Sequence, residues 1–250
     1  MERITESAIK RPPSPSRIAF QHAYIASPQQ VDSNLLILLH GLGDTQASYV
    51  DLGKQLQRAL PQCAVLALRG ARSVPLLGGG MWWDAWDPLG EMLPASAQNP
   101  AAFIDDFKKL LDELTMRGWQ SEHVHLLGFG QGATAALEGT HAWCRANKRL
   151  LGSVVAVCGG MLSFPNPPPL DVPVLHIHPP AAAHQRAQTT LQRAFQPLVV
   201  MPLSDDAQDR MPRGKEWEMV VRFWSEKGRW RNRAAWELKG EVYAVPGGQS

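Results

Sequence analysis

Cysteine is scarce in this chain of 250 residues, which contains three: Cys63, Cys144 and Cys158. The number is odd, and no two of them have the C-x-x-C spacing. This excludes a disulfide framework of the kind that stabilises small secreted proteins. We expect three buried thiols, as in proteins of the cytoplasm or nucleus.

The chain also lacks any long hydrophobic run and any strong excess of charge. No apolar stretch approaches the roughly 18 residues that a membrane-spanning helix needs, and the first residues lack the hydrophobic segment of a signal peptide. The formal net charge is +2, so the total charge does not indicate binding to nucleic acid. We therefore expect a soluble cytoplasmic or nuclear protein with no membrane span and no nucleic-acid partner.

Short apolar runs separated by helical patterns make up most of the chain. Residues 35–39 are apolar throughout, as expected for a parallel strand that is covered on both faces. Strands that alternate with helices predict an α/β fold, with a doubly wound, mostly parallel sheet and helices on both faces. We expect a flexible leader at 1–16, one domain at 17–228 and a tail at 229–250. Further strands are expected near residues 18–25, 64–68, 125–128, 152–158, 172–178 and 198–201.

One glycine-rich turn stands between a predicted strand and a predicted helix, at residues 128–132. Its sequence, Gly-Phe-Gly-Gln-Gly, matches the G-x-S-x-G turn that presents the nucleophile of many hydrolases, except that Gly130 occupies the serine position. Glycine adopts the unfavourable backbone conformation of this position freely. Backbone amides at the start of the following helix favour an anion or a carbonyl oxygen whatever the central residue is.

The order of several motifs resembles the α/β-hydrolase family of carboxylesterases, phospholipases and acyl-protein thioesterases over about residues 17–228. The motifs are the turn at 128–132, His40-Gly41-Leu42-Gly43-Asp44-Thr45, Leu68-Arg69-Gly70, Trp82-Trp83-Asp84 and Pro173-Val174-Leu175-His176-Ile177-His178. The resemblance implies that Leu42-Gly43 and Gln131 supply the two amides of an oxyanion hole. It also places Trp82, Trp83 and Trp86 where the family builds its substrate pocket. These tryptophans either cover the core or line a groove for an acyl chain, a peptide or a protein partner.

The same resemblance implies a serine, an acid and a histidine, and the chain has none of them at the expected positions. Gly130 has no side chain to form an acyl-enzyme. Ala182 stands at the position of the acid, and no histidine follows His184. We therefore expect a catalytically inactive member of the group that acts as a ligand-binding or protein-interaction module. Its ligand would be a small acyl or acidic compound, and no metal or cofactor is expected.

Two alternatives remain open. The first is an ester or thioester hydrolase that uses non-standard residues. Its catalytic groups would be a thiol–imidazole pair, Cys158 and His184, or the carboxylates of the tryptophan loop, Asp84, Asp87 and Glu91. The second is a structural subunit that docks on a protein partner through a tail rich in basic and aromatic residues, Arg229–Tyr243.

His176 and His178 share one face of a strand, and we interpret them as core residues because no third metal ligand has a clear spacing. His40 is expected to order the turn that follows it.

Overall fold

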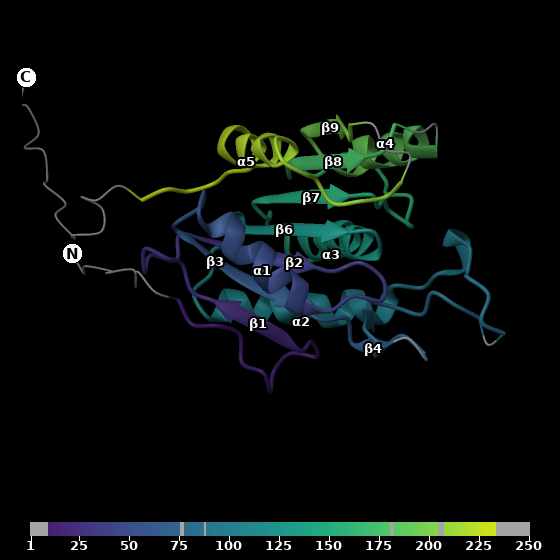
Figure 1. Cartoon of the computed structure of the whole chain (residues 1–250), viewed down its shortest axis with the longest axis horizontal. Helices are drawn as coiled ribbons and strands as arrows, with labels where there is room; N and C mark the ends of the chain where they lie inside the picture. The colour runs from purple at the N-terminus through teal and green to yellow at the C-terminus, as the bar shows by residue number, and fades with distance from the viewer. Residues whose placement is uncertain (1–9, 76–77, 88, 181–182, 205–207, 234–250) are drawn as a thin grey trace, which may run out of the picture.

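The computed structural model describes residues 10–75, 78–87, 89–180, 183–204 and 208–233, without the side chains of 183–186. A seven-stranded sheet runs through the molecule in the order β1-β3-β2-β6-β7-β8-β9. Every neighbouring pair is parallel except the edge pair β1–β3 (Figure 1). The strands are β1 His22–Ile25, β2 Asn34–Leu39, β3 Cys63–Leu68, β6 Val124–Phe129, β7 Ser153–Val157, β8 Val174–His178 and β9 Leu198–Pro202. Among the described residues, this arrangement confirms the predicted α/β fold.

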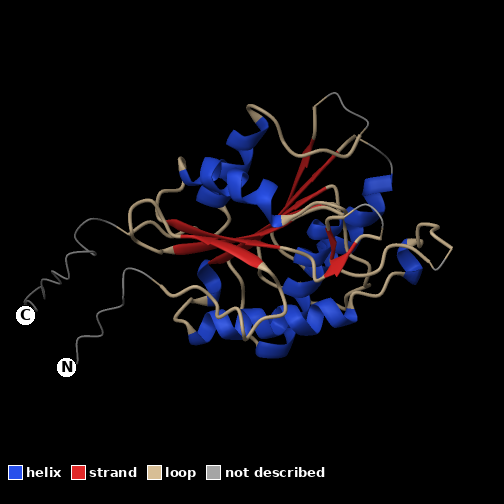
Figure 2. Ribbon diagram, turned by 60° about the horizontal axis from the view of Figure 1, so that its bottom comes forward, coloured by secondary structure: helices blue, strands red, loops and turns tan. Residues whose placement is uncertain are grey.

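Helices lie on both faces of this sheet (Figure 2). They are α1 Gln46–Gln57, α2 Ala101–Met116, α3 Gln131–Asn147, α4 Ala183–Ala194 and α5 Glu216–Glu226, with short 3₁₀ turns at Ala95–Ala97 and Ser121–His123. A two-stranded antiparallel ribbon, β4 Arg72–Ser73 and β5 Gly80–Met81, stands apart from the main sheet.

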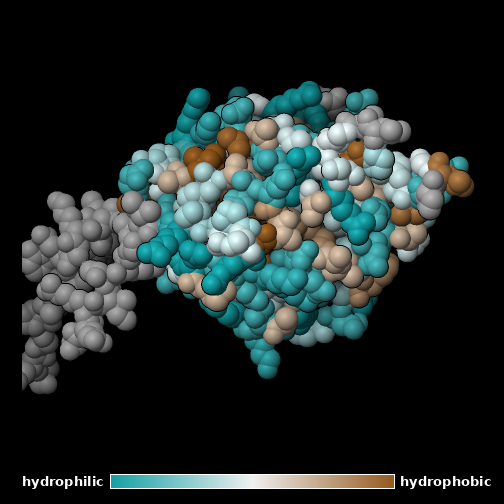
Figure 3. All heavy atoms as spheres, turned by 90° about the horizontal axis from the view of Figure 1, so that it is seen from below, coloured by the Kyte–Doolittle hydropathy of each residue, from teal (hydrophilic) through white to brown (hydrophobic). Residues whose placement is uncertain are grey.

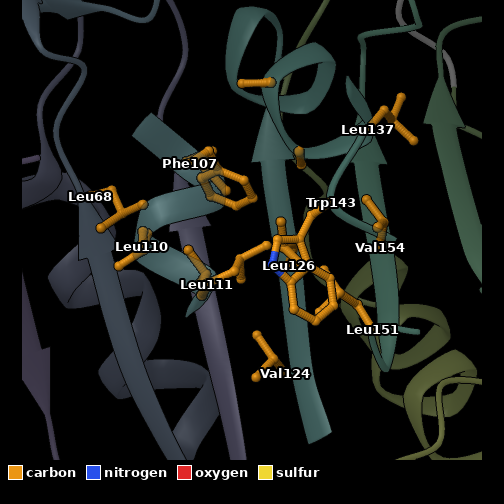
Figure 4. Packing of buried hydrophobic residues seen from close by; sticks show 14 of the residues in the cluster. Leu68, Phe107, Leu110, Leu111, Val124, Leu126, Leu137, Trp143, Leu151 and Val154 are labelled. Atoms are coloured by element: carbon orange, nitrogen blue, oxygen red, sulfur yellow. The ribbon is translucent and has the colours of Figure 1, made fainter. Parts of the chain in front are cut away.

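The central strand β2 shows how the apolar runs produce the layers. Its side chains alternate between the two faces, so Leu35 and Ile37 pack in one cluster and Leu36 in the other. The first cluster contains residues of α2, α3 and α4, and the second contains residues of α1 and α5. Figure 4 shows part of the first, where Leu110 of α2 lies near Leu68 of β3 and Leu111 lies near Leu126 of β6.

The expected flexible leader is packed against the domain in its described part. The Lys10 ammonium donates to the carbonyl of Gly118 (2.6 Å), and the Trp119 indole N–H donates to the carbonyl of Arg11 (3.3 Å). Residues 10 and 11 therefore lie beside the turn that follows α2. The start of the predicted leader, residues 1–9, lies outside the described residues.

The first residues of the expected tail also contact the domain. We call residues 229–233 the C-terminal strap. The ring of Trp230 lies 4.5 Å from that of His125 and 5.4 Å from that of Trp224. The strap then runs past the beginnings of β2 and β3, where Asn34 exchanges two hydrogen bonds with the backbone of residue 231 and Gln62 two with that of residue 233. These five residues therefore pack against the domain, and residues 234–250 of the expected tail lie outside the described part.

Hydrophilic side chains cover most of the surface seen in Figure 3. No helix in the described parts of the chain is long and apolar enough to cross a membrane.

Candidate functional site

The turn between β6 and α3 has the backbone geometry expected of a nucleophile position. Gly130 has φ 53° and ψ −119°, a left-handed region that glycine enters without steric cost. A Cβ added at Gly130 would meet no atom within 4 Å, whereas one at Gly128 would lie 2.2 Å from the carbonyl oxygen of Gly132. The outer glycines are thus required by close packing, and the central one lies beneath open space.

The open space above Gly130 belongs to a cavity of ≈ 460 Å³, which we call the elbow pocket. It lies where the parallel strands end, the usual place for ligands in an open α/β sheet. The turns after β2 and β6 contribute Leu42, Gly130 and Gln131. The remaining walls come from the tryptophan loop (residues 81–93), the 3₁₀ turn that follows it, helix α3, the segment after β7 and the loop before α5. Their lining residues are Trp83, Ala85, Met92, Ala95, Gln98, Thr134, Cys158, Gly159, Gly160, Met161, Leu162 and Asp209.

Two backbone amides at this pocket match the pair that the resemblance implies. The amides of Leu42 and Gln131 form no hydrogen bond with other described residues, and Gln131 is the first residue of α3. Amides at a helix start attract an anion or a carbonyl oxygen. Gly43 differs from the expectation, because its amide donates to the carbonyl of Gly80 (2.9 Å) and it does not line the pocket. Its contribution is to hold the turn.

The Gln131 side chain has a role that the sequence did not indicate. Its amide oxygen accepts from the backbone N–H of Trp82 (2.9 Å), and its amide nitrogen donates to the carbonyl of Trp83 (3.0 Å). This pair of hydrogen bonds joins the start of α3 to the tryptophan loop, so Gln131 fixes one wall of the pocket.

The three tryptophans predicted to lie together at the site have separate roles. Trp83 lines the pocket, and its indole N–H donates to the Gln98 side chain (2.9 Å). Trp82 instead belongs to the core, where it donates to the carbonyl of His40 (2.9 Å) and packs against Phe103. Trp86 is half-buried and does not line the pocket. Of the three, Trp83 alone is among the residues that line this pocket.

His40 orders the turn that follows it, as predicted. The N–H of Gly70 donates to its Nε2 (2.9 Å), so the proton of the neutral ring is on Nδ1, which donates to the carbonyl of Gly41 (2.7 Å). Burial lowers the pKa of His40 below its usual value. The imidazole is neutral, fully buried and occupied on both nitrogens, which leaves it no base function toward the pocket.

Cys158 lines the pocket close to Gly130, but its thiol is not activated. Burial is the main cause that raises its pKa to about 11, and the carboxylate of Asp209 also contributes. The Cys158 thiol donates to the carbonyl of Arg210 (3.6 Å). A thiol with this pKa is protonated at neutral pH and is a weak nucleophile. The side chain of its proposed partner His184 lies outside the described part of the structure, as does the whole of Ala182.

The other candidate groups are engaged in local structure. Asp84 forms an exposed ion pair with Arg72, and an Asp87 oxygen accepts from the amides of Leu89 and Glu91 (2.9 Å each). These contacts favour a local structural role for the carboxylates of Asp84 and Asp87.

The two histidines of β8 lie side by side in the interior. The rings of His176 and His178 are 4.9 Å apart. His176 contacts the carbonyl of Gly159 (3.1 Å), and His178 contacts the Gln188 side chain (2.9 Å). Within the described ranges, no group of three histidine, cysteine or carboxylate side chains has an arrangement that could hold a metal ion.

A partly buried ion pair lies next to Asp209, between Arg210 and Glu216 at the start of α5. Arg210 donates to both oxygens of Glu216, at 2.7 and 3.0 Å. Glu216 also accepts from the amides of Ser204 (3.0 Å) and Arg213 (2.7 Å) and from the Ser204 hydroxyl (2.7 Å). These donors, with Arg210 the largest cause, hold the Glu216 pKa well below its usual value.

Replacing Glu216 with glutamine should lower the free energy of unfolding by about 2–3 kcal/mol at pH 7, because an amide cannot accept from so many donors. The low pKa of Glu216 in the folded state means that its contribution is complete above about pH 4.3 and is lost as the pH falls below that value. The variant should therefore lose less stability than the wild type between about pH 5 and pH 3. Urea unfolding across this range measures both effects.

Glu226→Gln is the matched control, since Glu226 pairs with Arg222 on the exposed face of α5. It should cost about 1 kcal/mol or less. Equal losses in the two variants would contradict a special role for the Arg210–Glu216 pair.

The architecture and the sequence both match known proteins. A family model described as Phospholipase/Carboxylesterase matches residues 20–182. An uncharacterized hydrolase of Mycosarcoma maydis, UM10204, is 39% identical over 226 residues, which cover 88% of this chain and 85% of that protein. The Escherichia coli esterase YpfH is 27% identical over 150 residues, which cover 58% and 60% of the two chains.

Among solved structures, the esterase PE8 superposes with a TM-score of 0.66 and 17% identity, covering 83% of this chain and 99% of that one. A carboxylesterase from Mesorhizobium loti gives a TM-score of 0.64 at 17% identity, covering 86% and 98%. At this level of identity the two superpositions show the fold alone. The family model and the Mycosarcoma maydis relative go further, and by them this chain belongs to the phospholipase/carboxylesterase family of the α/β-hydrolase fold.

Proposed function

We propose that this protein binds a small acyl or acidic ligand in the elbow pocket and does not form an acyl-enzyme with it. One observation carries the proposal: the position of the nucleophile is Gly130, and the space above it is open. Covalent catalysis in this fold needs a side-chain oxygen or sulfur at that position. A pocket that keeps its amides and its volume without this atom is suited to binding.

The walls of the pocket indicate what kind of ligand it would hold. Leu42, Trp83 and Met161 are among several apolar residues that can cover an acyl chain, and the amides of Leu42 and Gln131 suit an oxygen acceptor. The volume of ≈ 460 Å³ is in the range of small-molecule sites.

The direct test is hydrolysis of short-chain p-nitrophenyl esters by the purified protein. We expect turnover at the level of buffer and no labelling of residue 130 by a fluorophosphonate, since Gly130 offers no hydroxyl. Turnover well above buffer that disappears in Cys158→Ser would contradict the proposal and favour the non-standard hydrolase. A thiol-directed probe that labels Cys158 rapidly at neutral pH would favour the same alternative, because a thiol with a pKa of about 11 should react slowly.

Restoring the hydroxyl alone should not restore hydrolysis. Gly130→Ser should fold, because the added Cβ meets nothing within 4 Å, at a cost of about 1–2 kcal/mol for the left-handed backbone. Ester turnover should stay at the wild-type level, since no histidine is among the described residues that line the pocket.

Gly214→Ser is a matched control with φ +50° and the same open surroundings, in the loop before α5. A rise in turnover in Gly130→Ser, but not in Gly214→Ser, would show that a working base faces position 130.

A further inference from the structure

Asp209 gives the elbow pocket a negative charge. Among the described lining residues it alone has a carboxylate side chain, and none has an ammonium, guanidinium or imidazole group; the others are apolar, amide, hydroxyl or thiol groups. It is in the loop between β9 and α5, and its side chain is largely exposed. Its carboxylate lies next to the Cys158 thiol, whose pKa it helps to raise.

The neighbouring arginine does not neutralise this carboxylate. Arg210 directs its guanidinium to both oxygens of Glu216 and to the carbonyl of Ser204 (2.9 Å). Within the described residues, Asp209 forms no ion pair with lysine or arginine. Its charge therefore remains available to a ligand.

The two side-chain amides of the pocket are already engaged in the walls. Gln131 binds the backbone of the tryptophan loop through both of its ends, and Gln98 accepts from Trp83 and donates to the carbonyl of Leu93 (3.1 Å). Two kinds of polar contact are left for a ligand. The amides of Leu42 and Gln131 can donate to a carbonyl oxygen, and Asp209 attracts a positive charge.

We infer that the elbow pocket selects acyl compounds that carry a cationic group, such as an ammonium, over neutral analogues and over free carboxylic acids. This inference rests on the proposed function and decides between the acyl and the acidic ligand. The amides hold the acyl carbonyl, the apolar walls cover the acyl chain, and the Asp209 carboxylate faces the cation. An anionic ligand is attracted by the amides at the start of α3 but is repelled by the Asp209 carboxylate, so it binds more weakly than the other two kinds of ligand.

Three butyryl esters with the same linker test this inference. Two have end groups of the same shape, trimethylammonium and tert-butyl, and the third ends in a carboxylate. Binding is followed by the fluorescence of the protein, since Trp83 lines the pocket, and by NMR shifts of the Gln131 amide. The cationic ester should bind about fivefold more tightly than the tert-butyl ester, as for a partly exposed ion pair. Raising the salt concentration should reduce this preference.

The variant Asp209→Asn should bind the cationic and tert-butyl esters equally, with the affinity of the tert-butyl ester unchanged. Asp51→Asn, which removes an exposed carboxylate of α1 that does not line the pocket, should keep the fivefold preference. A preference that survives Asp209→Asn, or tightest binding of the carboxylate ester, overturns the inference. Equal binding of all three esters overturns it and leaves the ligand pocket intact, whereas binding of none contradicts the proposed function as well.

Discussion

Replacing Gly132 with alanine should lower the free energy of unfolding by about 3 kcal/mol or more. The new Cβ would lie 2.3 Å from the carbonyl oxygen of Leu39 and 2.4 Å from that of His40. Both are backbone atoms at the end of β2, so the clash is relieved only if α3 moves away from the sheet. The gain of about 1 kcal/mol that alanine normally brings within a helix is too small to offset this cost.

Gly130→Ala provides the comparison within the same turn. Its Cβ meets nothing within 4 Å, and the cost is limited to the positive φ of 53°, about 1–2 kcal/mol. Urea unfolding of the two variants should therefore separate them clearly. A loss below about 1 kcal/mol for Gly132→Ala would show that α3 is not held as closely against β2 as the structure has it.

This difference explains why a hydrolase turn can persist without its nucleophile. Gly128 and Gly132 allow α3 to pack against the ends of β2 and β6, and the fold needs them whether or not chemistry takes place. Only the central position carries information about covalent catalysis. The two outer glycines are thus evidence for the fold, and Gly130 is the residue on which the proposed function depends.

The fold was predictable because the apolar runs are long enough to be buried on both faces. Residues 35–39 read as a covered parallel strand, and β2 is fully buried. The left-handed turn at Gly130 and the structural role of His40 also followed from short-range motifs. These features depend on neighbours within a few residues, so the sequence contains their physical cause.

The composition of the pocket was harder to predict because it depends on contacts between distant segments. Trp82, Trp83 and Trp86 are the same kind of residue in one loop, and hydrophobicity cannot tell which of them faces the core. Asp209 lines the pocket although it is far in the sequence from the other lining residues. The one available signal was its place after the last predicted strand.

The C-terminal strap was ambiguous for a similar reason. Basic and aromatic residues after a closing helix suit a solvated tail or a partner as well as the domain itself. The buried, polar side chains of Asn34 and Gln62 explain why the strap packs against the domain, since they bind the strap backbone at residues 231 and 233. Polar groups at strand starts need partners when buried, and here the strap provides them.

Replacing Trp230 of the strap with alanine should lower the free energy of unfolding by about 3 kcal/mol. The indole covers His125, which is fully buried, and His125 is further fixed by a contact with the Ser153 hydroxyl (2.9 Å). Burial lowers the pKa of His125 to about 3. Because this pKa is below that of the unfolded chain, about 6.5, His125 lowers the stability progressively as the pH falls from about 6.5 toward 3.

Removal of the indole should admit water to His125 and raise its pKa toward 6.5, so the variant should show a shallower loss of stability with falling pH over this window. NMR titration of the His125 ring and unfolding at several pH values measure the two effects.

Trp217→Ala is the control, since Trp217 is also half-buried on this face of the sheet but lines the groove between α1 and α5 instead. It should leave the His125 pKa unchanged. An unchanged His125 pKa in Trp230→Ala would show that the Trp230 indole does not exclude water from the histidine. The strap would then stabilise the fold through its backbone hydrogen bonds to Asn34 and Gln62.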